Sequence, residues 1–202
     1  MLNYFSKKEW TLWISSVSAI LISFVLFDRT NFLTLIASII GVTSLIFNAK
    51  GNPIGQFLMV VFSLLYGIIS YSFSYYGEMI TYLGMSAPMA VASTISWLRH
   101  PYKESKSVEI HKLKGYQALL MVVLTAIVTT AFYFILKALG TQNIVFSTIS
   151  VTTSFVAVYL TLMRSPYYAI AYALNEVKQK GYGIVTPTMD ELELDEPEMI
   201  KQ

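Results

Sequence analysis

The sequence of residues 54–76 is IGQFLMVVFSLLYGIISYSFSYY, and it contains no charged side chain. A helix of about 20 apolar residues is long enough to cross the ~30 Å hydrocarbon core of a bilayer. The sequence therefore predicts an all-α fold, a polytopic membrane helix bundle. Five further stretches share this length and apolar character: Trp10–Phe27, Asn31–Phe47, Met79–Leu98, Gly115–Leu136 and Asn143–Met163. Together with residues 54–76 they give six predicted spanning helices.

The composition excludes a soluble protein. Hydrophobic residues make up 55% of the 202 residues and charged residues only 13%, whereas a soluble domain carries about 25% charge. The first apolar stretch is not a cleavable signal peptide, because it ends without a small-residue cleavage site and another span follows at once. The chain has no cysteine, so disulfides and thiolate metal sites are excluded.

The basic residues predict the orientation, because cytoplasmic loops are enriched in Lys and Arg. With the N-terminus in the cytoplasm, nine basic residues fall in inside loops and two in outside loops. We therefore expect a multi-pass protein of the cell (plasma) membrane with a cytoplasmic N-terminus. The inside group is Lys7, Lys8, Lys50, Arg99, Lys103, Lys106, Lys112, Lys114 and Arg164; the outside group is Arg29 and Lys137.

The pattern changes after Arg164. Pro166 is typical of a first helical turn, but the helical segment predicted for residues 166–177 is too short to cross a bilayer. Residues 178–202 carry the acidic run DELELDE and two prolines, which predicts a soluble tail. The sequence thus divides into a transmembrane domain, residues 1–176, and an acidic tail, residues 178–202.

Catalytic and cofactor motifs are missing from the sequence. It has no nucleotide-binding glycine loop, no metal-ligand cluster and no hydrolase elbow. We therefore expect neither an enzyme nor a cofactor, metal or nucleic-acid site. What remains is polar and aromatic residues at membrane depth, which are costly in lipid and so indicate a site inside the bundle.

Two amides and one phenol stand out in the first half. Asn52 and Gln56 lie four residues apart, on one helix face, and amides suit a neutral ligand with hydroxyl or amide groups. A helix cap next to Pro53 explains Asn52 equally well. Tyr66 lies about halfway through its span, where its ring could stack on a planar ligand.

A second group follows Pro166. Tyr168, Tyr172 and Asn175 have the i, i+4, i+7 spacing of a single helix stripe. For so short a helix, an amphipathic segment lying in the membrane interface is the stronger interpretation. A ligand-facing stripe is the alternative.

These residues resemble the PnuC-type vitamin transporter family, best known for nicotinamide riboside transporters. The resemblance covers about residues 10–176. It rests on Asn52-x-x-Gly55-Gln56, Leu65-Tyr66-Gly67-Ile68-Ile69-Ser70, Tyr75-Tyr76-Gly77-Glu78-Met79, Pro88-Met89, Trp97-Leu98-Arg99, Arg164-Ser165-Pro166-Tyr167-Tyr168 and Ala171-Tyr172-Ala173-Leu174-Asn175.

The resemblance implies a transporter with two parallel three-helix repeats joined by a linking helix. It implies nicotinamide riboside uptake by facilitated diffusion, with a separate cytoplasmic kinase trapping the substrate for NAD biosynthesis. Thiamine or riboflavin as the vitamin, and assembly as a homo-oligomer, stay open. The substrate-binding residues it implies are Asn52, Gln56, Tyr66, Tyr168, Tyr172 and Asn175.

The second repeat is incomplete in this sequence. Family members usually have an Asn-Asp pair where Asn175-Glu176 stands, and they continue with a full helix and one more span. We therefore expect a member truncated at its C-terminus. A partner-dependent or non-transporting membrane subunit is the alternative.

Overall fold

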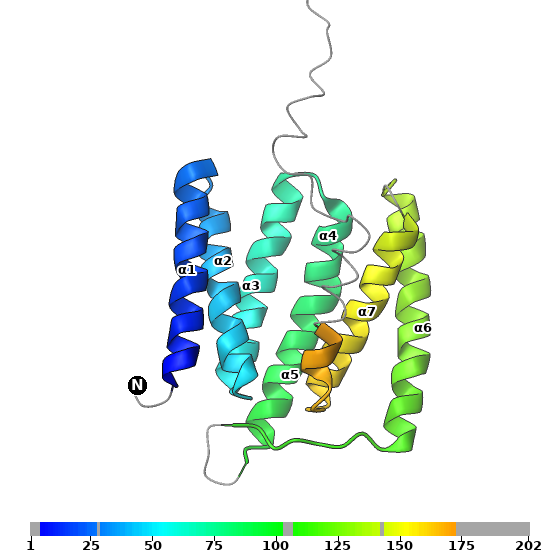
Figure 1. Ribbon diagram of the computed structural model, residues 1–202. Coiled ribbons are helices and arrows are strands. Elements are labelled where there is room, and N and C mark those ends of the chain that lie inside the picture. Colours follow the sequence, from blue (N-terminus) through cyan, green and yellow to red (C-terminus); the bar gives the residue numbers. More distant parts are fainter. Residues whose placement is uncertain (1–4, 28, 103–106, 142–143, 173–202) are drawn as a thin grey trace, which may run out of the picture.

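The computed structural model describes residues 5–27, 29–102, 107–141 and 144–172 (Figure 1). Within these ranges the chain is helical, with one isolated bridge between Pro101 and Val108 and no named strand, and the all-α prediction is confirmed. The elements in chain order are α1 Lys7–Phe27, α2 Phe32–Ala49, α3 Pro53–Ser72, α4 Tyr76–Ile80, the π-helical η1 Thr81–Ser86, α5 Ala87–Arg99, α6 Gly115–Ala138 and α7 Ile144–Leu162.

Five of these helices, α1, α2, α3, α6 and α7, are each long and apolar enough to cross a membrane. The sixth predicted span lies in the consecutive elements α4, η1 and α5, which are helical without a break. Pro88 explains the π-helical turn, because its ring has no N–H and clashes with the carbonyl of the residue four positions earlier. The wider η1 turn before it relieves that clash.

The prediction of one continuous span from residue 54 to residue 76 was wrong at its end. α3 stops at Ser72, and Ser74 has the left-handed φ of 61°. The Tyr75 N–H reaches back to the Ser70 carbonyl at 2.8 Å, which is a Schellman helix ending. Tyr76 therefore begins α4 instead of ending α3.

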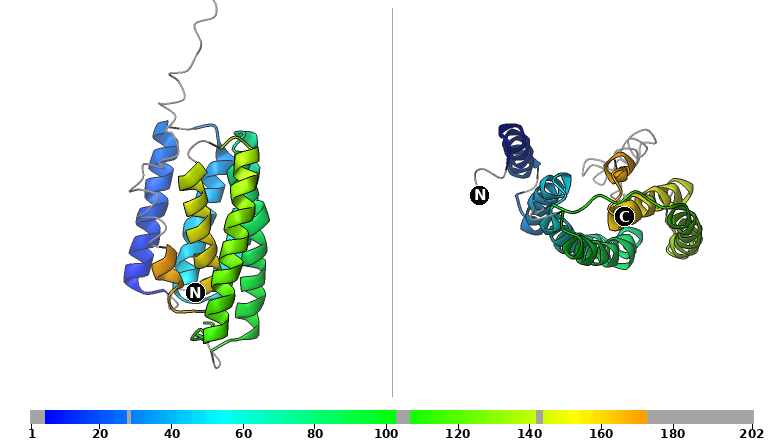
Figure 2. Two further views of the ribbon diagram at one scale, coloured as in Figure 1. Left: turned by 90° about the vertical axis from the view of Figure 1, so that its right-hand side faces the viewer. Right: turned by 90° about the horizontal axis from the view of Figure 1, so that it is seen from below.

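The helices form a bent row in which neighbours in space are α1, α2, α3, α5, α7 and α6. Viewed from below, the row is curved, and the short helical segment of residues 168–172, coloured orange, lies on its inner side (Figure 2). Residue 175 and the predicted tail, residues 178–202, lie outside the described residues.

α6 and α7 share an apolar core with η1, and polar contacts join α7 to α5. Met85 of η1 packs with Phe132 of α6 and Phe155 of α7 in this core. Trp97 of α5 is fully buried, and its indole N–H donates to the Thr161 carbonyl of α7 at 2.9 Å. The hydrogen bond satisfies the indole where no water is available.

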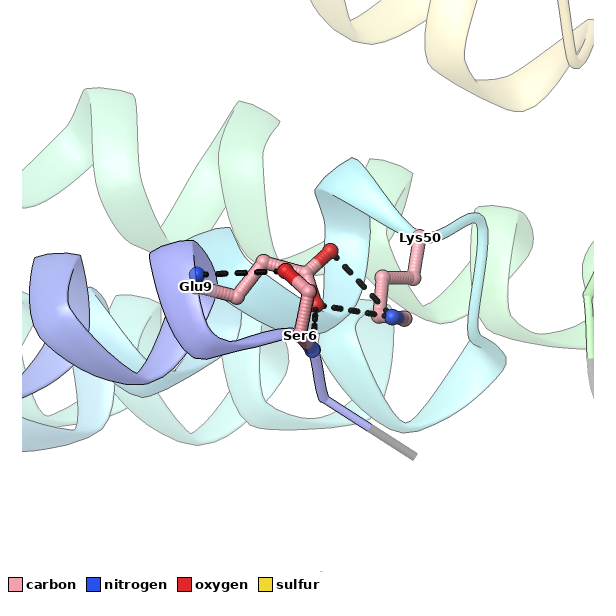
Figure 3. A network of polar contacts seen from close by, with 3 residues as sticks. All are labelled: Ser6, Glu9 and Lys50. Atoms are coloured by element: carbon pink, nitrogen blue, oxygen red, sulfur yellow. Dashed lines mark hydrogen bonds and ion pairs between the residues drawn. The ribbon is translucent and has the colours of Figure 1, made fainter. Parts of the chain in front are cut away.

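α1 lies at the edge of the row and has no buried residue. Its N-terminal end is tied to the α2–α3 corner by polar contacts (Figure 3). The Lys50 ammonium lies 2.9 and 3.2 Å from the two carboxylate oxygens of Glu9. Ser6 caps the helix, because its hydroxyl oxygen accepts the Glu9 N–H at 3.3 Å, and its own N–H donates to the Glu9 carboxylate at 2.7 Å. Trp13 adds a hydrogen bond to Thr43 of α2 at 3.1 Å.

α2 and α3 approach each other closely at Gly55. A Cβ atom added to Gly55 would come within 2.6 Å of the Asn48 backbone nitrogen and 2.8 Å of its side-chain Cγ. Side chains of the last turn of α2 and backbone of the first turn of α3 therefore share this space. Small residues at such crossings let membrane helices approach closely.

We expect Gly55→Ala to destabilise the folded protein by about 1–3 kcal/mol, because α2 and α3 must separate to admit the methyl group. The measurement is the melting temperature in detergent. Gly115→Ala is the matched control, since nothing lies within 4 Å of an added Cβ there. An unchanged melting temperature for Gly55→Ala would contradict the close approach.

Candidate functional site

The corner between α2 and α3 carries the first two predicted site residues. Gly51 ends α2 with a left-handed φ of 66°, and Asn52 is the N-cap of α3. The Asn52 side-chain oxygen accepts the Ile54 N–H at 3.0 Å, and Pro53 occupies the first turn. The cap interpretation of Asn52 is therefore confirmed, and the buried Asn52 amide lies at the start of α3.

Gln56 is buried in a relay of neutral side chains between α2 and α3. Its Nε2 donates to Asn48 Oδ1 at 2.8 Å, and Asn48 Nδ2 donates to Ser44 Oγ at 3.3 Å. The Ser44 hydroxyl donates to the Gly55 carbonyl at 2.8 Å. The three side chains are 0–7% exposed, so each needs these partners.

Tyr168 joins this corner from the other half of the chain. Its hydroxyl donates to the Asn48 carbonyl at 2.8 Å, and its ring meets Trp97 edge to face with centroids 6.2 Å apart. The structure therefore brings Tyr168 to the same corner as Asn52 and Gln56. Tyr172 is half-buried one turn later, whereas Asn175 lies outside the described residues.

Tyr66 lies elsewhere. It is ten residues after Gln56 on the same helix, which places it ~15 Å further along the axis. Its ring packs against Tyr82 of η1 and Phe62 of α3, with centroids 4.5 and 5.5 Å apart. Tyr66 therefore belongs to a separate aromatic group at mid-helix, and the structure does not bring it together with the corner amides.

Two serines extend this mid-helix group. Ser63 and Ser70 flank Tyr66 on α3 and are 0% and 1% exposed; the Ser63 hydroxyl has no hydrogen-bond partner among the described residues, and the Ser70 hydroxyl lies beside the Glu78 carboxylate. Gly67 lies between them, and a Cβ there would come within 2.5 Å of Leu83. Buried hydroxyls of this kind need a partner, so they are candidate ligand groups.

The sequence analysis missed Ser44 and Asn48. They are spaced four residues apart and therefore share one face of α2. That spacing inside an apolar span was an available signal, but the predicted span ended at Phe47 and so left Asn48 in a loop.

The connection from α5 to α6 contacts both halves of the row at this end (Figure 2). The Val108 N–H donates to the Gly51 carbonyl at 2.8 Å, and the His111 N–H donates to the Arg164 carbonyl at 3.1 Å. Gly51 and Arg164 are the left-handed residues that follow α2 and α7. The connection therefore spans the two corners that precede Asn52 and Tyr168.

An open apolar groove lies between α6 and α7, away from these residues. Its lining includes Met121, Thr125, Thr129 and Thr152, and none of the predicted site residues.

In the described part of the chain, no three His, Cys, Asp or Glu side chains form a group that could hold a metal ion.

A helical row of this length and hydropathy, with its buried polar side chains turned inward, defines a multi-pass membrane protein. Comparison with known proteins identifies the family. Residues 31–178 match the family described as "Nicotinamide mononucleotide transporter", and the chain belongs to this family. The family is one of transporters, not enzymes, which agrees with the lack of catalytic motifs.

Two relatives extend this match. The chain is 27% identical over 163 residues to "Nicotinamide riboside transporter PnuC" of Neisseria mucosa; the match covers 78% of this chain and 60% of that protein, so the chain spans about 60% of that relative's length. The "Crystal structure of the Vitamin B3 transporter PnuC" superposes with a TM-score of 0.74, at 22% identity, over 90% of this chain and 78% of that one. This similarity confirms the fold.

A local similarity of 43 residues, 46% identical, links the chain to "Stage IV sporulation protein A" of Clostridioides difficile. It covers 21% of this chain and 9% of that protein. It is too short to bear on the fold.

We expect Tyr168→Phe to lower stability by about 1 kcal/mol, because the Asn48 carbonyl loses a donor that comes from the other half of the chain. Thermal unfolding in detergent measures the change. Tyr167→Phe is the matched control, since Tyr167 is 63% exposed. Equal melting temperatures for the two variants would mean that the Tyr168 hydroxyl does not join the halves.

Proposed function

We propose that this chain transports a vitamin-type nucleoside across the cell membrane by facilitated diffusion, with nicotinamide riboside as the leading substrate. The observation that carries the proposal is the corner where buried neutral amides of α2 and α3 meet Tyr168. Amides offer both donors and acceptors, which matches the carboxamide and hydroxyl groups of such a nucleoside. Family membership and the PnuC relative support the same substrate class.

The proposed roles follow from the side chains. Asn52 and Gln56 hydrogen-bond the ligand, and Asn175, outside the described residues, would add a third amide. Tyr168 and Tyr172 stack on the pyridinium ring, whose positive charge is attracted to aromatic faces.

Tyr66 fits the proposal at a different depth. Tyr66, which packs against Phe62 and Tyr82, lies ~15 Å along α3 from Gln56, which exceeds hydrogen-bond reach from one ligand position. We place it on the path of the ligand, so that the substrate meets the aromatic group and the corner amides in turn. The unpartnered Ser63 hydroxyl would be a donor and acceptor on that path.

The repeat arrangement of the PnuC family is part of the proposal. α2 and α7 both end in a left-handed residue, at Gly51 and Arg164, and a proline follows two residues later in each case. These matching corners support two parallel repeats with α6 as the linker. Homo-oligomer formation and substrate trapping by a cytoplasmic kinase belong to the same proposal and follow from the family resemblance.

Binding of nicotinamide riboside to the purified protein is the first test. We expect the melting temperature to rise with this nucleoside and not with thiamine or riboflavin, because a ligand that binds only the folded state stabilises it. Asn52→Ser should remove most of the shift, since serine keeps the helix cap but lacks the amide.

Asn31→Ser is the matched control for Asn52→Ser. Asn31 caps α2 in the same way, with its side-chain oxygen 3.3 Å from the Thr34 N–H, but it lies at the other end of the helix from the corner. If the ligand raises the melting temperature of Asn52→Ser as much as that of Asn31→Ser, Asn52 does not bind the ligand. If only thiamine or riboflavin raises the melting temperature, that vitamin is the substrate instead.

The proposed orientation places the α5–α6 connection in the cytoplasm. Since the chain has no cysteine, single cysteines report accessibility without background labelling. In right-side-out vesicles, an impermeant maleimide should label Thr30→Cys and leave Glu109→Cys unlabelled until the membrane is opened. Both positions are exposed on the protein surface. The reverse labelling pattern would show that the topology is opposite to the proposed one.

A further inference from the structure

The hydrogen-bond relay at the α2–α3 corner has a fixed direction. It begins at the Gly55 carbonyl, which can only accept. The Ser44 hydroxyl has one proton, and it donates that proton to Gly55 at 2.8 Å. Toward Asn48, therefore, Ser44 Oγ can act only as an acceptor.

This requirement orients the next two amides. Asn48 must present its NH₂ group to Ser44, at 3.3 Å, so its Oδ1 faces Gln56. Gln56 must then present Nε2 to Asn48 Oδ1, at 2.8 Å, which turns Gln56 Oε1 away from α2. Because all three side chains are buried and none is ionisable, pH does not reverse the order.

The surroundings keep the relay rigid. Asn48 lies so close to Gly55 that an added Cβ would overlap its side chain, which leaves no space for a bridging water on that side. The Asn48 carbonyl is also held by the Tyr168 hydroxyl at 2.8 Å. Flipping either amide would put two donors or two acceptors face to face at a buried site, which is costly.

We infer that Ser44, which lies two hydrogen bonds from Gln56, sets the ligand selectivity of the corner by holding Gln56 Oε1 as the acceptor that meets the substrate. The group that occupies this position is then an O–H or N–H donor, and a carboxylate or ether oxygen there is rejected. The inference rests on the proposed function and makes Ser44 and Asn48 positioning residues of its site.

For nicotinamide riboside the donor is either the ring carboxamide or a ribose hydroxyl. Nicotinic acid riboside replaces the carboxamide NH₂ by a carboxylate oxygen, and the 2′-deoxy, 3′-deoxy and 5′-deoxy forms remove one hydroxyl each. In the native protein, one of these analogues should bind at least ~100-fold more weakly than nicotinamide riboside, because it leaves a buried acceptor unpaired. The analogue that fails names the donor.

Ser44→Ala is the decisive variant. Without the hydroxyl, Asn48 and Gln56 are free to turn together, so the discrimination between nicotinamide riboside and that analogue should fall to within about tenfold, one lost neutral hydrogen bond. Ser93→Ala, a buried serine on α5 outside the relay, should keep the native ratio. Ser44→Thr retains the hydroxyl and should restore the ratio.

Full discrimination in a folded Ser44→Ala protein, or equal binding of all five ligands by the native protein, would overturn the inference. If no nucleoside binds, the proposed function is wrong, and a separate measurement then tests the relay without ligand. In a double-mutant cycle of Ser44→Ala and Gln56→Leu, the melting temperatures should be non-additive although the two side chains share no direct hydrogen bond. Additive changes would overturn the relay without any ligand.

Discussion

The close approach of α2 and α3 at Gly55 is the contact on which this structure depends. Lipid supplies no hydrophobic force between helices, so small residues and interhelical hydrogen bonds must hold the bundle together. The missing side chain at Gly55 lets Asn48 lie against the α3 backbone, and Ser44 and Gln56 then complete a polar chain in a dry interior. The same contact that packs the helices also orients the amides of the proposed site.

The two halves of the chain are joined at carbonyls in the last turns of two helices. The Asn48 and Thr161 carbonyls each accept a backbone N–H from the turn that follows, of Gly51 at 2.8 Å and of Arg164 at 3.0 Å, and a carbonyl oxygen can accept a second hydrogen bond. The Asn48 carbonyl in the last turn of α2 accepts from Tyr168, and the Thr161 carbonyl in the last turn of α7 accepts from Trp97. Each link takes its donor from the opposite half of the chain. The corner therefore forms only where the two halves of the bundle pack together.

The sequence predicted the class of protein and the helical fold because apolar runs are local properties. It misplaced what depends on distant partners. Asn48 lay just beyond a predicted span, and its role needs Gln56 from the next helix and Tyr168 from the other half. Tyr66 was grouped with Gln56 by chemistry, although ten residues of helix rise already separated them by ~15 Å. α3 ends early because Ser74 adopts a left-handed backbone conformation, which the conformational preference of serine does not predict.

The buried polar residues in the described part of the chain are all neutral: Ser44, Asn48, Asn52, Gln56, Ser63, Ser70, Ser93, Thr161 and Ser165. A compact ammonium or carboxylate would therefore meet no buried counter-charge among these groups and would keep its full desolvation cost. A pyridinium spreads one charge over an aromatic ring, and aromatic faces such as those of Tyr66, Tyr82 and Tyr168 attract it without an ion pair. Glu78 is the exception near the mid-helix group: its carboxylate lies within electrostatic range of Tyr66 and beside the Ser70 hydroxyl, so the surroundings of that group are not neutral. The corner of α2 and α3, by contrast, is lined by neutral amides and hydroxyls, whose hydrogen bonds rather than charge orient a polar group.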